Sequence, residues 1–110
     1  MQAHQVEEPE LRARPLGTPA TVTLMPEYSV GVPLWPLGDS TDALVPEGLL
    51  VKLMSWQADF VVNFHWETGW RSQAAKERWA AAAVPLEAEL RAALEGKAEV
   101  KVDLWPLNSD

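Results

Sequence analysis

The most constraining feature of the sequence is an apolar stripe with helical spacing between residues 46 and 65. The stripe repeats every three or four positions, at Leu49, Leu53, Trp56, Phe60 and Phe64, and is widened by Leu50, Met54 and Val61. Such spacing gathers side chains on one face of an α-helix. Pro46 and Glu47 suit its first turn, where a missing N–H costs nothing and a carboxylate favours the helix dipole. The sequence therefore predicts an amphipathic helix over residues 46–65.

A second amphipathic helix is predicted over residues 72–94. Ser72 is a candidate N-cap and Gly96 a candidate terminator. The apolar positions between them are Ala75, Trp79, Ala82, Leu86, Leu90 and Ala93. Pro85 removes one helical hydrogen bond and its ring crowds the preceding turn. We therefore expect a kink or short break near residues 81–84.

Three stretches are typical of strands, namely residues 21–25, 28–35 and 98–105. Apolar and polar residues alternate in them, and Pro33 favours an edge position for the second. Residues 34–37 and 104–107 both read Leu-Trp-Pro-Leu. This repeat indicates either two neighbouring parallel strands or a coincidence in a chain rich in leucine and proline.

The length of 110 residues suits one domain. Residues 1–20 hold three prolines, several charges and few apolar residues, which predicts a disordered N-terminal tail. Residues 21–110 would form a single α/β domain. The expected fold is α/β or α+β, a two-layer sandwich in which two antiparallel helices cover a small sheet of about three strands.

The composition argues against several classes of partner and of catalytic site. Sixteen acidic against nine basic residues give a net charge of −7, which argues against nucleic acid or an anionic membrane as a partner. The absence of cysteine excludes thiolate metal sites and Cys nucleophiles, and no phosphate-binding or hydrolase motif occurs. His65 has no second ligand nearby in sequence, so we predict no catalytic residues, no metal and no cofactor. No signal-like or membrane-spanning apolar run occurs, and a cytoplasmic location is expected.

Six tryptophans are the oddity of the composition. Trp56 and Trp79 lie on the helical stripes and are predicted to be core residues. The other four lie in the connection between the helices or at strand exits, namely Trp66, Trp70, Trp35 and Trp105. Tryptophan is enriched at interface hot spots, so these four are candidates for either structural anchoring or partner contact.

Negative charge is concentrated in residues 39–70, which hold five acids and one base. An acidic surface bordered by tryptophans suits a basic protein partner. The alternative explanation is that the net negative charge serves only to keep a small protein soluble. The predicted partner-binding residues are Asp39, Asp42, Glu67, Trp66, Trp70, Trp35 and Trp105.

Four segments carry a resemblance: residues 34–36, 56–60, 67–72 and 78–80. Together they resemble small acidic proteins of actinobacterial type over residues 22–107, a likeness that implies no activity. In size and charge the chain is also similar to immunity proteins of bacterial toxin systems. No shared motif supports that similarity, so it assigns no residue a role.

The predicted function is a non-enzymatic protein-binding domain, in the form of an immunity or antitoxin-type inhibitor of a basic partner such as a toxin. One alternative is a small-molecule site, a tryptophan-lined pocket between the strand exits and the helix connection with His65 or Glu67 as its polar group. Another is a structural subunit whose tryptophan surface forms a homodimer.

Overall fold

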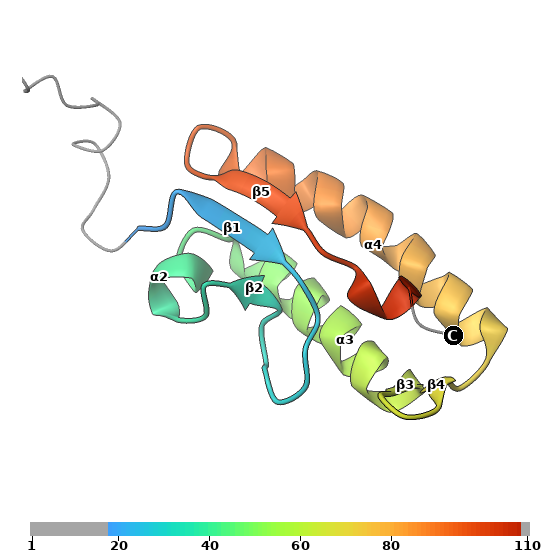
Figure 1. Cartoon of the computed structure of the whole chain (residues 1–110). Helices are drawn as coiled ribbons and strands as arrows, with labels where there is room; N and C mark the ends of the chain where they lie inside the picture. The colour runs from blue at the N-terminus through green and yellow to red at the C-terminus, as the bar shows by residue number, and fades with distance from the viewer. Residues whose placement is uncertain (1–17, 109–110) are drawn as a thin grey trace, which may run out of the picture.

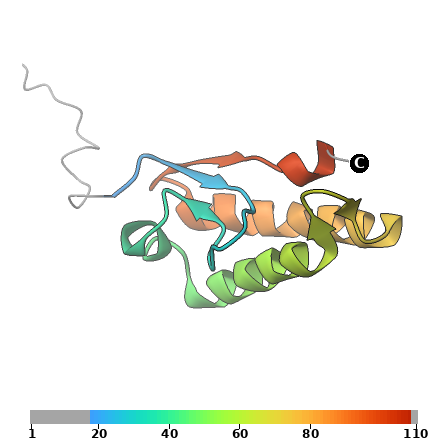
Figure 2. The ribbon, with the colours of Figure 1, turned by 60° about the horizontal axis from the view of Figure 1, so that its bottom comes forward.

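Two helices pack on one face of a three-stranded sheet, which is the expected two-layer arrangement in its α+β form (Figures 1 and 2). The computed structural model describes residues 18–108. Its elements are β1 (Thr21–Leu24), β2 (Leu34–Trp35), α2 (Asp39–Asp42), α3 (Glu47–Asn63), β3 (Phe64–His65), β4 (Gly69–Trp70), α4 (Gln73–Leu94), β5 (Glu99–Val102) and the 3₁₀-helix η2 (Trp105–Asn108). Of the predicted tail, residues 1–17 lie outside the described residues. The carbonyl of Ala20 accepts a hydrogen bond from the Glu99 N–H (2.9 Å).

The sheet has the order β2-β1-β5. β1 pairs with β5 in parallel, with Val22 opposite Val100, and with β2 in antiparallel, with Leu24 opposite Leu34. Of the two interpretations of the Leu-Trp-Pro-Leu repeat, the pairing of its two copies as neighbouring parallel strands is therefore wrong, because β1 lies between them. A short connection after β1 turns β2 back beside it, whereas the helices make the long crossover that a parallel strand requires.

The strands are shorter than the sequence suggests. Residues 28–33 form a loop instead of a strand, with Ser29 at a positive φ of 66° and the Met25 N–H donating to the Pro33 carbonyl (3.0 Å). Trp105 begins η2, so the last strand ends at Val102. In both cases an alternating pattern continues into backbone that turns away from the sheet.

Helix α3 confirms the predicted apolar stripe, but it does not bury all the residues that were expected to widen it. Leu53 and Phe60 are fully buried. Met54 and Val61 remain 45% and 47% exposed, so their assignment to the core stripe is wrong. The helix ends at Asn63, because the extended backbone of Phe64 starts the short hairpin β3–β4.

Helix α4 runs from Gln73 to Leu94 without the expected break at residues 81–84. The Ser72 hydroxyl caps it by accepting from the Ala75 N–H (3.0 Å), as predicted. Pro85 is exposed, and so is Ala81, whose carbonyl loses its usual donor at that point. The buried positions are Ala75, Trp79, Ala83, Leu86, Leu90 and Leu94, so the stripe passes through Ala83 and Leu94 where Ala82 and Ala93 were expected.

Candidate functional site

Five of the six tryptophans are structural anchors. Each donates its indole N–H to a backbone carbonyl of another segment, and we call these five the anchored tryptophans: Trp35, Trp56, Trp70, Trp79 and Trp105. Buried indoles usually find such an acceptor, because an unpaired polar group inside a protein costs free energy. The five differ in burial and in the elements that they connect.

Trp56 and Trp79 join α3 to α4. Their rings stack with centroids 4.4 Å apart and planes 10° from parallel. The Trp56 Nε1–H donates to the Trp79 carbonyl (3.1 Å), and the Trp79 Nε1–H donates to the Trp56 carbonyl (3.2 Å). Both side chains are buried. The prediction that these two are core residues is confirmed.

The tryptophans at the strand exits hold the chain just after β1. Trp35 donates to the Met25 carbonyl (3.0 Å) and Trp105 donates to the Pro26 carbonyl (2.8 Å). Trp70 in turn donates to the carbonyl of Pro106 in η2 (3.0 Å). All three indoles are half-buried. Their N–H groups are already used inside the domain.

The rings of Trp70 and Trp105 also fill space within the domain. Both pack edge-on against Phe64, with centroids 5.2 Å and 5.5 Å away. Both also contact Phe60 edge-on. These contacts join Trp70 and Trp105 to the aromatic residues at the end of α3.

Trp66 differs from the anchored tryptophans. It is 70% exposed, and within residues 18–108 its indole N–H has no acceptor. Its ring stacks on His65 (5.7 Å, 22°), and the Glu67 N–H donates to the His65 Nδ1 (3.1 Å). We call residues 65–68 the hairpin tip. It presents an apolar ring, an unused donor and a carboxylate to the outside.

The hairpin below this tip is firmly held. The Tyr28 hydroxyl donates to the Phe64 carbonyl (3.2 Å), and the Arg71 N–H donates to the Asn63 carbonyl (2.7 Å). Burial raises the pKa of the Tyr28 hydroxyl; the Trp66 backbone N–H acts in the opposite direction and the Glu27 charge adds to the rise. Gly69 adopts a φ of 84°, which favours glycine and lets the chain turn back.

A buried side chain fixes the loop that carries Tyr28. Gln57 is 2% exposed on α3, and its Nε2 donates to the carbonyls of Glu27 and Val30. Its Oε1 accepts from the Glu27 N–H (3.3 Å). The hairpin tip therefore rests on a supported loop, and Trp66 is presented from a preorganised position.

The predicted acidic residues do not form one surface. Asp39 and Asp42 lie in α2, before α3, whereas Glu67 lies in the hairpin that follows it (Figure 1). The 17 residues of α3 separate the two places by about 25 Å. Burial raises the pKa of the Asp42 carboxyl, and the Asp39 charge adds to the effect. The two acids of α2 and Glu67 of the hairpin therefore belong to separate surfaces.

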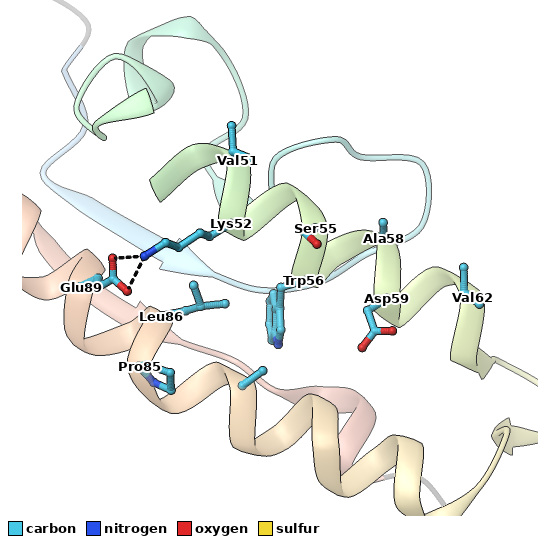
Figure 3. Close-up of a pocket in the computed structure, with 11 residues that line it drawn as sticks. Val51, Lys52, Ser55, Trp56, Ala58, Asp59, Val62, Pro85, Leu86 and Glu89 are labelled. Carbon is cyan, nitrogen blue, oxygen red and sulfur yellow. Dashed lines mark hydrogen bonds and ion pairs between the residues drawn. The ribbon is translucent and has the colours of Figure 1, made fainter. Parts of the chain in front are cut away.

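A hollow on the outside of the helix layer was not predicted. We call it the outer groove; it has a volume of about 870 Å³. It lies between α3 and α4 and is lined by Val51, Lys52, Ser55, Trp56, Ala58, Asp59, Val62, Ala82, Pro85, Leu86 and Glu89. Figure 3 shows Lys52 reaching across it to Glu89, with Nζ 3.0 Å from Oε1. The sequence signal was the set of apolar residues outside the core stripe of α3.

The described residues also bear on metal binding and membrane crossing. Within residues 18–108, no group of three or more His, Asp or Glu side chains is placed to hold a metal ion. No helix in the same part of the chain has the length and apolar composition needed to cross a bilayer. Comparison with known proteins found no matching family model, no matching curated protein and no matching solved structure.

Proposed function

We propose that this chain is a non-enzymatic protein-binding domain that engages a basic partner through the hairpin tip. The observation that carries the proposal is Trp66, whose ring is 70% exposed and whose N–H has no acceptor within residues 18–108, whereas the other five indoles donate to backbone carbonyls. Exposed tryptophans on a supported backbone are typical hot-spot residues, because they bury a large area with little loss of side-chain freedom.

The charge of the tip supports a basic partner. Glu67 follows Trp66 directly, and the whole chain carries a net charge of −7. An aromatic face beside a carboxylate suits an arginine or lysine side chain, which can stack on the ring and pair with the acid. The acids of α2 are too far away to join this contact, so we assign Asp39 and Asp42 a role in long-range steering only.

An immunity or antitoxin-type inhibitor is the form of this function that we propose. Its support is the small size, the acidity and the lack of cysteine, which are general features and not a motif. The cytoplasmic location expected from the sequence stays part of the proposal. Fractionation of the source cells tests that location directly.

The decisive experiment compares captured proteins and binding kinetics for matched variants. Wild type and three variants, Trp66→Ala, Glu67→Lys and Leu37→Ala, are used as bait in extracts of the source cells. Leu37 is the control, because it is 51% exposed but lies near α2. We expect one basic protein to be retained by wild type and Leu37→Ala and lost from Trp66→Ala.

Kinetics with the purified partner then separate the two tip residues. Trp66→Ala should speed dissociation about 30-fold, which corresponds to ~2 kcal/mol for a hot spot. Glu67→Lys should slow association and flatten its dependence on salt, since rim charges act mainly through steering. A partner whose affinity is unchanged by both substitutions, or the absence of any basic partner, contradicts the proposal.

A further inference from the structure

The outer surface of the helix layer is apolar in a way that the fold itself does not require. On α3, Val51 and Val62 are 61% and 66% exposed, and both line the outer groove. Ala58 lies between them in the sequence and also lines the groove, whereas Met54 and Val61 are exposed on α3 outside the groove lining. We call this surface, together with the groove side of α4, the outer face. Exposed apolar patches of this kind usually mark interaction sites.

The two halves of the outer face differ in shape. α3 contributes the bulky side chains Val51 and Val62. α4 contributes small or flat ones, Ala82 and Pro85 in the groove and the exposed Ala81 beside them. A two-fold related copy would place the bulky strip of each α3 on the small strip of the other α4. Such self-complementarity is what an isologous interface needs.

The charges of this face also favour a second copy over an oppositely charged protein. The groove holds one cation and two acids, and Lys52 is already paired with Glu89. Asp59 accepts from the Asn63 Nδ2 (2.8 Å). The groove thus offers little net charge to a basic protein, although the chain carries −7. Across a two-fold axis, Lys52 and Glu89 can exchange partners without loss.

The size of the face is adequate for a dimer. Its length along α3 is about 25 Å and the width of two adjacent helices is about 20 Å. That footprint is ~500 Å² in projection, and the relief of the side chains adds accessible area, which brings the face near the low end of stable interfaces, about 600 Å² per partner. We propose that the outer face is where two copies of this chain associate. The hairpin tip follows the end of α3 and stays free, so this inference does not depend on the proposed function.

The test uses two valines of nearly equal exposure. Val62 is 66% exposed and lines the groove, whereas Val84 is 68% exposed and is not among its lining residues. Helical geometry places Val84 about 200° around α4 from Ala82. Val62→Glu and Val51→Glu would bring like charges into the contact, and Val84→Glu is the matched control.

Sedimentation velocity gives the mass of each protein. Wild type and Val84→Glu should sediment at twice the chain mass of 12.2 kDa. Val62→Glu and Val51→Glu should raise the dissociation constant at least tenfold, with unchanged circular dichroism as the check on folding. Added salt should leave the dimer intact or strengthen it, because it screens the repulsion between two acidic chains. Added salt should instead weaken the binding of a basic partner at the hairpin tip, because it screens the attraction between opposite charges.

Cross-linking locates the contact independently. Because the chain has no cysteine, single-cysteine variants report one position each. Ala58→Cys should be linked into dimers by a short bis-maleimide, and Val84→Cys should not. Wild type that stays monomeric at concentrations of about 100 μM overturns the proposal, since a stable interface of this size binds at micromolar concentrations or below. Equal dissociation by Val84→Glu and Val62→Glu overturns it as well.

Discussion

Trp70 and Trp66 lie four residues apart in the same connection, yet the structure uses them in opposite ways. Trp70 is half-buried in β4, packs on Phe60 and Phe64, and donates its N–H to Pro106. Trp66 is in the turn, 70% exposed, and no residue within 18–108 accepts its N–H. The destination of the indole N–H therefore separates an anchoring tryptophan from one that is exposed to solvent.

The use of the indole N–H distinguishes all five anchored tryptophans from Trp66. The anchored tryptophans connect segments far apart in sequence, as Trp105 does with Pro26 and Trp56 with Trp79. They hold the layers of a small domain together where no disulfide can. The largest effects of tryptophan substitution on stability should therefore come from the centre of this network, and the smallest from the hairpin tip.

Trp79→Ala should have the largest effect on stability. Trp79 is fully buried, stacks on Trp56 and also contacts Phe60 and Trp70. Its removal leaves a cavity and should cost ~3–5 kcal/mol. For a domain that holds roughly 5–15 kcal/mol, that approaches unfolding.

Urea denaturation followed by circular dichroism measures this loss. Trp79→Phe serves as a milder variant, which keeps a ring but removes the donor to the Trp56 carbonyl. A loss below about 1 kcal/mol for Trp79→Ala would remove Trp79 from the centre of the network. Trp79 and Trp66 would then not differ in their contribution to the free energy of unfolding.

Trp105→Phe should have an intermediate effect. The phenyl ring keeps part of the edge-on packing against Phe64, but the Pro26 carbonyl loses its donor. Because Pro26 is buried, we expect a loss of ~1–3 kcal/mol, the range for a buried polar group left unpaired. Trp66→Phe, measured in the same urea titration, is the matched control and should show no such loss. Equal effects of the two substitutions would contradict a special role for the indole donor.

The helices could be predicted well from sequence because their signals are local. Spacing gave both helices nearly their observed bounds, and Ser72 caps α4 as expected. Strand order could not be read in this way. The repeated Leu-Trp-Pro-Leu segments look like neighbours, but β1 inserts between them, and that depends on contacts between residues far apart in the chain.

The candidate site could be predicted only in part, for a similar physical reason. Trp66 and Glu67 were identified by composition and position, but nothing local distinguishes Trp66 from Trp70. The outer groove was missed because Val51, Ala58 and Val62, which line it, fall outside the core stripe and were given no role from the sequence. An apolar side chain beside a stripe faces either a neighbour or solvent, and only the packing of α4 against α3 decides which.

Trp66→Ala should have the smallest effect on stability of the three. Trp66 is not part of the core and donates no hydrogen bond from its indole within residues 18–108, and its ring stacks on the exposed His65. The free energy of unfolding should therefore change by less than ~0.5 kcal/mol, as for an ordinary surface position. Iodide quenching of fluorescence gives a second measurement, because removal of the most exposed indole should greatly reduce the quenchable fraction. A stability loss above about 1 kcal/mol would show that Trp66 is part of the anchoring network. A small loss means that any weakening of partner binding by Trp66→Ala reports the contact itself.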